Sequence, residues 1–409
     1  ATYQSAKAQY DANLAKADQG KAQLLPQVGL SAGATRSQRD VTPTTAPSTT
    51  NYNYTTQTAG INATQPLYRP ANLATYRQSQ KSLELAQAAL NQAEQDLVVR
   101  VSQAYFDVLS AQDSLAFVQA QKAAVAEQLA SAKRNFEVGT ATITDTREAQ
   151  ARFDLVTAQE IAADNDLRVK TVALELLVGK AGLKPVRLQS GVNLPAVDGQ
   201  GVDSWIAQSE QNHPTIRQAR VNLDVAKLET EKAVAGHKPT VDLTLGYNSQ
   251  KNINGTSIQL TGVTNQINVA SAGITFNLPL YAGTATQNRI RETTALEEKA
   301  RMDLEGAQRQ VTQATRTAYL GLQSGLGQVK AYEAAEASSQ VALDANKLGY
   351  QVGVRINIDV LNSQSQLYQT KRDLAKARYD VLVGQLKLRQ AAGVLKAEDL
   401  QPINALLAP

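Results

Sequence analysis

Apolar residues recur every three or four positions over two very long stretches of the chain. The first series is Leu97, Val101, Tyr105, Val108, Leu115, Val118, Val125, Leu129, Ala132 and Phe136. This spacing is close to the 3.5-residue repeat of a helix that packs lengthwise against other helices. We therefore predict a helix over residues 69–137, which would be about 100 Å long at 1.5 Å per residue.

Each long helix is predicted to turn back into a second one. Gly139 ends the first helix, since glycine readily takes the left-handed conformation that follows many helices, and a returning helix is expected over 144–178. The second half copies this pattern, with helices over 287–351 and 359–390 and a turn at Gly353. Helices of this length cannot fold back on a compact core, so they need other long helices beside them.

Two stretches without any charged side chain, 41–68 and 252–288, stand out in a chain that is 19% charged. Apolar and polar residues alternate in Val241, Leu243, Leu245 and Tyr247, and again in Ala270, Ala272, Ile274, Phe276, Leu278 and Leu280. We predict strands within 27–66 and 239–280, with one apolar face and one polar, uncharged face. A sheet between lipid and a water-filled lumen requires such faces; soluble hairpins with polar loops are the alternative.

The predicted strands, two in each half of the chain, are too few to close a barrel by themselves. Open strand edges are not tolerated in lipid, and small membrane barrels need about eight strands. The protomer must therefore borrow strands from copies of itself, and two, three or four copies would give roughly 8, 12 or 16 strands. The long helices of the same copies would then form a helical tube under the barrel.

The chain contains two copies of one unit. Residues separated by 214 positions match in these pairs: Ala104-Tyr105 with Ala318-Tyr319, Val138-Gly139 with Val352-Gly353, Asp145 with Asp359, and Gly179 with Gly393. Similarity at a fixed separation indicates a repeated structural unit.

The repeat defines the predicted organisation of the chain. The segments are a first repeat over 1–180 that opens with a helix over 2–25, an equatorial linker over 181–213, a second repeat over 214–393 that opens with a helix over 214–236, and a tail over 394–409. The second repeat has a lead-in that the first lacks. We therefore expect about 15–20 further residues before position 1 in the natural protein.

Composition excludes several classes of protein. Of the 409 residues, 43% are apolar but only 5% are aromatic, which suits narrow helix–helix seams better than a thick core. The absence of cysteine rules out disulfides, thiolate nucleophiles and cysteine metal sites. The net charge of +4 is small and no Lys/Arg run predicts nucleic-acid binding. No apolar run is long enough for a transmembrane helix, which needs about 18 residues.

No constellation of residues predicts catalysis or a cofactor. His213 and His237 lie beside prolines without a third ligand, so no metal site is expected. The glycines Gly321, Gly325 and Gly327 do not match a phosphate-binding loop and are interpreted as close helix contacts. An enzyme is therefore not expected.

Short motifs in a fixed order cover nearly the whole chain. They are Leu24-Leu25-Pro26-Gln27-Val28-Gly29-Leu30, Gln65-Pro66-Leu67-Tyr68, Asn135-Phe136-Glu137-Val138-Gly139, Ile143-Thr144-Asp145, Lys238-Pro239-Thr240-Val241-Asp242-Leu243, Leu278-Pro279-Leu280-Tyr281, Ile358-Asp359-Val360-Leu361 and Ala377-Arg378-Tyr379. Each motif alone is weak, but the set is specific. The chain closely resembles the TolC-type family of outer-membrane efflux and secretion channels.

The resemblance implies an α+β membrane protein that forms a homotrimer. Such a trimer has a 12-stranded β-barrel, with four strands from each protomer, continued by a tunnel of 12 helices. A mixed equatorial domain would surround the tunnel, built from residues 181–213 and from the tail after Gly393. Trp205 is expected to be a buried anchor of a short helix in this domain.

The resemblance also implies a function without catalysis or cofactor. The family provides a passive exit duct in the bacterial outer membrane, with the helical part in the periplasm, for tripartite efflux or type I secretion. The implied partners are a periplasmic adaptor protein, an inner-membrane transporter driven by protons or ATP, and outer-membrane lipid. The cargo, drugs and other small molecules or proteins, is left open.

In this family the helix tips open like an iris, and residues of this chain match those that hold the tips closed. Tyr350, Arg355 and Asp145 match the network of hydrogen bonds and salt bridges between the inner helices. The residues alone allow simpler roles. Asp145 and Glu148 form a capping-box pattern at a helix start, Tyr350 could pack in the last helical turn, and Arg355 could be an exposed charge.

Asp359 matches the acidic ring that narrows the periplasmic entrance of the family's pore. The family prototype has a second acid three residues later, where this chain has Asn362. The resemblance therefore implies one acidic ring instead of two. Asp359 also lies at a helix start, so a helix-capping role is the alternative.

The turns between the long helices match the tips at which the family meets its adaptor. The residues of the two tips are Val138, Gly139, Thr140, Val352, Gly353 and Val354.

A self-assembling filament subunit is the competing hypothesis. Filament proteins of the flagellin kind also lack cysteine and combine heptads with Ala, Gln, Asn and Thr. Two matching halves, each with an uncharged strand pair, are not explained by a filament. Solubility without detergent would favour it.

Overall fold

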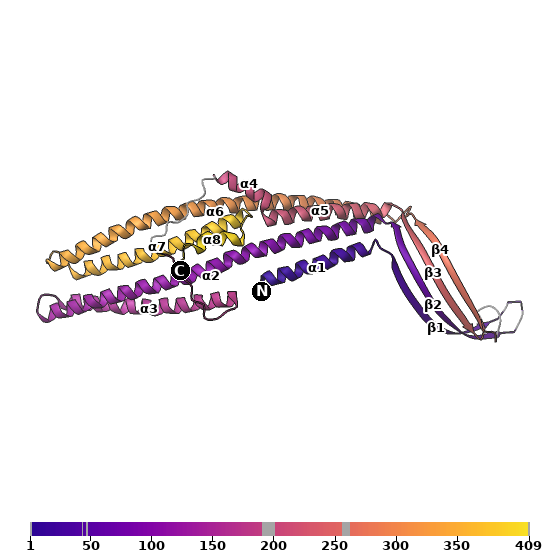
Figure 1. The fold of residues 1–409 in the computed structure, drawn as a ribbon, viewed down its shortest axis with the longest axis horizontal. Coiled ribbons are helices and arrows are strands. Elements are labelled where there is room, and N and C mark those ends of the chain that lie inside the picture. Colours follow the sequence, from indigo (N-terminus) through magenta and orange to yellow (C-terminus); the bar gives the residue numbers. More distant parts are fainter. Residues whose placement is uncertain (1, 43, 46–47, 190–200, 256–261, 408–409) are drawn as a thin grey trace. The chain divides into compact units, whose positions relative to one another are not determined.

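The computed structural model describes residues 2–42, 44–45, 48–189, 201–255 and 262–407 (Figure 1). Its first half contains α1 (Thr2–Ala22), β1 (Gln27–Val41), β2 (Thr50–Tyr68), α2 (Pro70–Glu137) and α3 (Ile143–Val178). Its second half contains α4 (Val202–Asn212), α5 (Pro214–Val234), β3 (Thr240–Ile253), β4 (Asn265–Asn277), α6 (Ala285–Gln351), α7 (Asn357–Ala391) and α8 (Leu400–Asn404). Apart from α4 and α8, both halves have the order helix, two strands and two long helices.

The helices predicted from the hydrophobic spacing are present. The ends of the four long helices α2, α3, α6 and α7 fall within two residues of the prediction. The shorter helices predicted over 2–25 and 214–236 stop earlier, at Ala22 and Val234. None of the helices carries, within the described residues, an apolar stretch long enough to span a bilayer.

The strand prediction extends too far at one end. β4 stops at Asn277, although the apolar alternation continues through Leu278 and Leu280. Pro279 interrupts this segment, and proline has no N–H group for the hydrogen bonds of a strand ladder.

The chain divides into two compact units, and each unit draws on both halves of the sequence. The first unit comprises Tyr3–Ala88 and Gln218–Glu305, and the second comprises Ala89–Arg217 and Gly306–Pro409. The units therefore differ from the two sequence repeats, because equivalent elements of the repeats pack together. In the first unit, for example, β2 of one repeat pairs with β3 of the other.

The first unit contains one antiparallel sheet with the strand order β1-β2-β3-β4. Cross-strand partners lie on the same face of a sheet, and the registry Leu30–Ile61–Tyr247–Ala270 joins apolar residues across all four strands. Seven large apolar residues on this face are at least 47% exposed: Val28, Leu30, Ile61, Leu245, Tyr247, Ile274 and Phe276. Val241 and Leu243, nearer the helical end of the same face, are half-buried. The predicted alternation is confirmed, and the apolar face is not covered by the rest of the chain.

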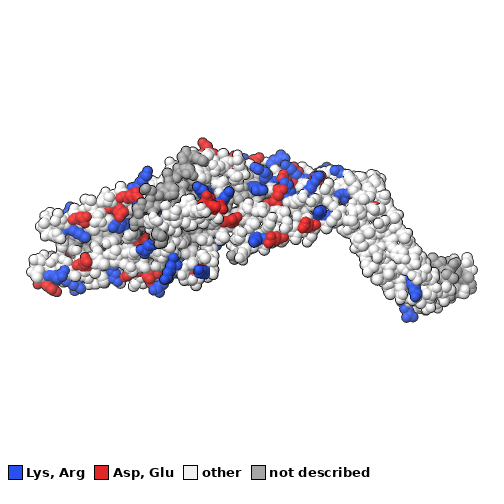
Figure 2. Space-filling view, viewed as in Figure 1, with Lys and Arg blue, Asp and Glu red and all other residues white. Residues whose placement is uncertain are grey.

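Charged residues lie only near the two ends of this sheet. Arg36, Arg39 and Lys251 lie close to the loops that connect the strand pairs, and Figure 2 shows basic side chains at that end of an otherwise almost uncharged strand region. At the helical end, the Arg69 Nε and Nη2 atoms donate to the Asp242 carboxylate at 2.7 and 2.6 Å. The apolar band between them carries no charge, as a lipid-facing surface requires.

In the second unit, α7 is the central helix. It packs against α2 through Phe106, Leu109 and Leu382, and against α6 through Leu343 and Leu367. α3 contacts it as well. In contrast, α3 and α6 keep large apolar side chains exposed. They include Ile161, Val169, Leu176, Leu320 and Val341, each at least 59% exposed.

The predicted equatorial linker, 181–213, lies partly outside the described residues, which omit 190–200. One described end of the linker pairs with the tail, because Leu188 forms an antiparallel bridge with Leu407. Trp205 of α4 is 6% exposed and packs in an apolar cluster with α6 and α7. Its predicted role as a buried anchor is confirmed.

Candidate functional site

The only side of α7 left exposed within the described second unit is polar. Its exposed residues are Asn362, Gln366, Gln369, Lys376, Asp380 and Lys387. They follow one another at intervals of three, four or seven, which places them on one face of a helix. Asp359 and Asp373 lie half-buried on the same face. We call this face the α7 stripe, and its polarity suits contact with water better than contact with another helix.

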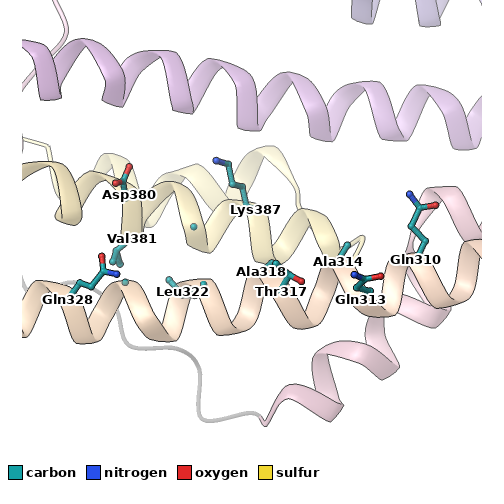
Figure 3. Close-up of a pocket in the computed structure, with 13 residues that line it drawn as sticks. Gln310, Gln313, Ala314, Thr317, Ala318, Leu322, Gln328, Asp380, Val381 and Lys387 are labelled. Carbon is teal, nitrogen blue, oxygen red and sulfur yellow. The ribbon is translucent and has the colours of Figure 1, made fainter.

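An open groove of about 690 Å³ runs beside the stripe between α6 and α7. In Figure 3, Asp380 and Lys387 extend from α7, while Gln310, Gln313 and Gln328 belong to α6. The groove therefore combines small and apolar residues, such as Ala314, Leu322 and Val381, with polar groups that include one negative and one positive charge, and it is open rather than enclosed.

Gly321, Gly325 and Gly327 of α6 were all predicted to make close helix contacts, but their surroundings differ. A Cβ atom on Gly325 would lie 3.2 Å from Val381 Cγ2, so the predicted close helix contact is confirmed there. Within one described chain Gly321 and Gly327 make no such contact, because a Cβ atom at either position would meet nothing within 4 Å. Spacing along one helix does not reveal where the partner helix lies.

The two tips have the same backbone structure. Gly139 and Gly353 take left-handed φ values of 80° and 77°. Each tip is closed by equivalent hydrogen bonds, from Thr140 N–H to the Asn135 carbonyl and from Val354 N–H to the Gly349 carbonyl, both 2.8 Å long. The tips also expose three valines. They are Val138, Val352 and Val354, which are 73%, 65% and 78% exposed.

Asp145 caps helix α3. Thr142 is the N-cap residue, and it forms a capping box in which its hydroxyl accepts from the Asp145 N–H at 3.2 Å and its own N–H donates to the Asp145 carboxylate at 2.9 Å. Asp145 is therefore the third residue of the box, whereas the sequence pattern made it the first, with Glu148 as its partner.

The predicted gate residues each have a partner outside the predicted trio. As far as the structure describes the chain, no hydrogen bond or ion pair joins Asp145, Tyr350 and Arg355 to one another. Arg355 Nη1 lies 3.7 Å from Asp359 Oδ2, and the Tyr350 hydroxyl accepts from Asn135 Nδ2 at 3.3 Å. The partner of Arg355 is thus on its own hairpin, α6–α7.

Polar contacts that sequence reasoning missed connect the α2–α3 hairpin to the α6–α7 hairpin. The central one is Asn357, which is fully buried at the start of α7. Its Nδ2 donates to the Asp145 backbone carbonyl at 3.4 Å and its Oδ1 accepts from Gln128 Nε2. A buried amide needs such partners, but its position in the sequence, between Arg355 and Asp359, was the only signal that could have pointed to it.

Two contacts concern the predicted constriction. Asp359 lies in the first turn of α7, which has no side-chain cap hydrogen bond, so the proposed capping alternative for Asp359 has no such bond to support it. Asn362 Oδ1 accepts from Arg152 Nη2 of α3 at 2.8 Å. The Arg152 guanidinium therefore lies beside Asn362, about one helical turn from Asp359.

Two groups of the second unit with shifted pKa values, Tyr379 and His213, lie among packed helices. The Tyr379 hydroxyl donates to Asp113 at 2.6 Å, and burial together with this carboxylate raises the pKa of Tyr379 well above its usual value. Burial lowers the pKa of His213. Within the described ranges no group of three His, Cys, Asp or Glu side chains could hold a metal ion.

A sheet with an uncovered apolar face and long helices with a continuous polar stripe define a membrane channel protein. The family of outer membrane efflux proteins matches residues 2–180 and 205–394 of this chain. The chain belongs to this family. It is therefore a non-enzymatic channel protein of the bacterial outer membrane, where it provides an exit duct.

Known proteins are similar to this chain over nearly its whole length. The chain is 34% identical over 401 residues to the outer membrane protein TolC of Vibrio cholerae serotype O1, with 98% of this chain and 89% of that protein covered. It is 32% identical over 415 residues to the alkaline protease secretion protein AprF of Pseudomonas aeruginosa, at coverages of 98% and 84%. The crystal structure of the outer membrane protein VceC of Vibrio cholerae has a TM-score of 0.78 at 20% identity, covers 95% of this chain and 92% of that chain, and shows a common fold.

Proposed function

We propose that three copies of this chain form the complete duct. β1 and β4 are the edge strands of the sheet within the described residues, and open edges are not stable in lipid. Three copies would supply a 12-stranded barrel of suitable size for an aqueous channel. The exposed apolar side chains of α3 and α6 would pack between protomers, and the helices would close a tunnel of 12 helices.

The α7 stripe would line this tunnel, and it is the observation that carries the proposal. α7 is buried by three other helices, and its one exposed side is polar throughout the described residues. A helix that turned this side toward a protein neighbour would bury several charges, which is costly unless each charge is paired. Water in a lumen avoids that cost.

The duct would serve tripartite efflux or type I secretion. A relative at 32% identity is named as an alkaline protease secretion protein, and its similarity covers both repeats. The proposed partners are a periplasmic adaptor that contacts the six tip residues and an inner-membrane transporter. The exposed valines of the tips support this docking role, because they offer apolar surface on rigid turns.

The gate would be closed by contacts between the two hairpins of each protomer. In this proposal Asn135 holds Tyr350, and Asn357 connects Gln128 to the Asp145 backbone. Asp145 acts through its capped turn, and Arg355 screens Asp359 at the constriction. Opening would separate the hairpins at their tips, in the manner of an iris, and would break these few polar contacts while the apolar seams further along remain.

Conductance in planar bilayers tests the duct. We expect detergent-extracted protein to have the mass of a trimer and to form channels with a small, mostly closed conductance. The Asp359→Asn variant should lose much of the channel's interaction with cations. A soluble filament, or a protein that forms no channel in bilayers, would contradict the proposal.

A further inference from the structure

Arg152 brings a positive charge to the α7 stripe beside the predicted acidic ring. Its Nη2 donates to Asn362 Oδ1 at 2.8 Å, and Asn362 is exposed on the stripe. Asn362 follows Asp359 by three residues, so the two side chains lie about one helical turn apart on the same face. The contact lies within the second unit, between α3 and α7.

The charge of Arg152 is not neutralised by this contact. Asn362 is an amide without net charge, and a guanidinium stays protonated at any physiological pH. Arg355 Nη1 lies 3.7 Å from Asp359 Oδ2. The Asp359 carboxylate is therefore accompanied by two guanidinium groups, one in ionic contact and one a helical turn away.

We propose that Arg152 is a selectivity-determining residue of the pore entrance. With Arg355 it partly offsets the charge of Asp359, so that the entrance prefers cations only weakly and retains multivalent cations poorly. This inference rests on the proposed pore lining by α7. It goes beyond the loss of one acidic ring, because it assigns a cation to the place of the missing acid.

The first test is the reversal potential in planar bilayers under a KCl gradient. Arg152→Gln removes the charge and can keep a hydrogen bond to Asn362. The Arg152 guanidinium lies about one helical turn from the Asp359 carboxylate, close enough for its charge to lower cation occupancy at the ring even in water. We therefore expect the potassium-to-chloride permeability ratio to rise about two- to threefold at low salt.

Arg147→Gln is the matched control. Arg147 is exposed on the same helix, but five residues earlier, so its side chain leaves α3 about 140° away from that of Arg152. Its removal changes the net charge equally and should leave the permeability ratio unchanged. If Arg152→Gln and Arg147→Gln both form intact trimers and have the same permeability ratio, the proposed role of Arg152 is wrong.

The second test is a double-mutant cycle with Asn362→Asp and block by a trivalent cation such as hexamminecobalt(III). Asn362→Asp alone should strengthen block only weakly, because the new carboxylate would pair with Arg152. In the Arg152→Gln background the same change should create a second acidic ring and strengthen block much further, which is a non-additive outcome. Strictly additive effects would contradict the inference.

Asp359→Asn separates this inference from the proposed function. If it leaves permeability ratio and trivalent block unchanged, Asp359 does not face the pore and the proposed lining is wrong. If Asp359→Asn changes both but Arg152→Gln changes neither, the lining stands and only the role of Arg152 is overturned.

Discussion

Single residues of this chain have different roles at equivalent positions of the two repeats. Gly179 and Gly393 are separated by 214 positions, follow the ends of α3 and α7, and take left-handed φ values of 76° and 71°. Their surroundings differ. A Cβ atom on Gly179 would meet nothing within 4 Å, whereas one on Gly393 would lie 2.5 Å from the Cα atom of His213.

This difference predicts unequal costs for one substitution. Gly179→Ala should cost about 1 kcal/mol of stability, from backbone strain alone. Gly393→Ala should cost clearly more, because the new methyl group meets backbone atoms that cannot rotate away. Thermal unfolding of the trimer in detergent measures both. Equal shifts of the melting temperature would show that the contact between Gly393 and His213 is absent.

The hydrogen bond between Asn135 and Tyr350 predicts a gating effect at the same scale. Tyr350→Phe removes the acceptor hydroxyl, and a single hydrogen bond contributes about 0.5–1.5 kcal/mol. Three symmetric copies would favour the closed state by a few kcal/mol, so the variant should spend more time open in bilayer recordings.

The control removes a hydroxyl elsewhere in the second unit. The Tyr105 hydroxyl donates to the Val186 carbonyl and accepts from the Val186 N–H, far along α2 from the tip. Tyr105→Phe loses these two hydrogen bonds, more than Tyr350→Phe loses, and should still leave the open probability unchanged. If both variants gate alike, the contact between Asn135 and Tyr350 does not hold the tips closed.

At the scale of elements, the hairpin turns combine a left-handed backbone that glycine adopts without strain with exposed apolar side chains. We expect Gly353→Trp to abolish export while trimer yield stays near normal, because a Cβ atom at this position meets nothing within 4 Å and the side chain starts from open space. The cost to stability is limited to the left-handed backbone, about 1–2 kcal/mol. Export of a drug or a secreted protein from cells is the measurement.

Gly182→Trp provides the comparison. Gly182 also has a left-handed φ, 74°, and open space around it, but it lies in the linker. This variant has the same backbone strain and the same added bulk, and it should export normally. Export that survives Gly353→Trp would show that this tip is not the docking surface.

The whole molecule carries more uncovered apolar surface than a single chain can keep in water. The apolar face of the sheet, the edges of β1 and β4, and the outer faces of α3 and α6 are all unpartnered within the described chain. Burial of such surface by copies of the same chain couples folding to assembly.

We therefore expect no stable folded monomer. Protein extracted in mild detergent should have the mass of a trimer, and dilution should lead to unfolding in place of release of folded single chains. Analytical ultracentrifugation together with circular dichroism measures both properties. A folded monomer at micromolar concentration would contradict the barrel and the tunnel alike.

The sequence by itself determined the elements of this protein and their repetition. The spacing of apolar residues along 69–137 predicts a helix, because it depends only on residues that are close together in the sequence. The alternation through Leu243 and Leu245 predicts a strand for the same reason. The matching halves and the motifs identified the class of protein. These signals do not depend on which segments meet in space.

Only the tertiary structure decided which polar groups meet. The resemblance grouped Arg355, Asp145 and Tyr350 in one network, and within one chain the structure places Arg355 beside Asp359 and Asp145 in the capping box of α3. Asn357 and Arg152 were missed altogether. Each of these contacts depends on how two helices are rotated, and how far they are shifted along their axes, relative to one another. Arg152 and Asn362, for example, are more than 200 residues apart in the sequence. Hydrophobic periodicity states which face of a helix is buried, but not which distant residue lies across the seam.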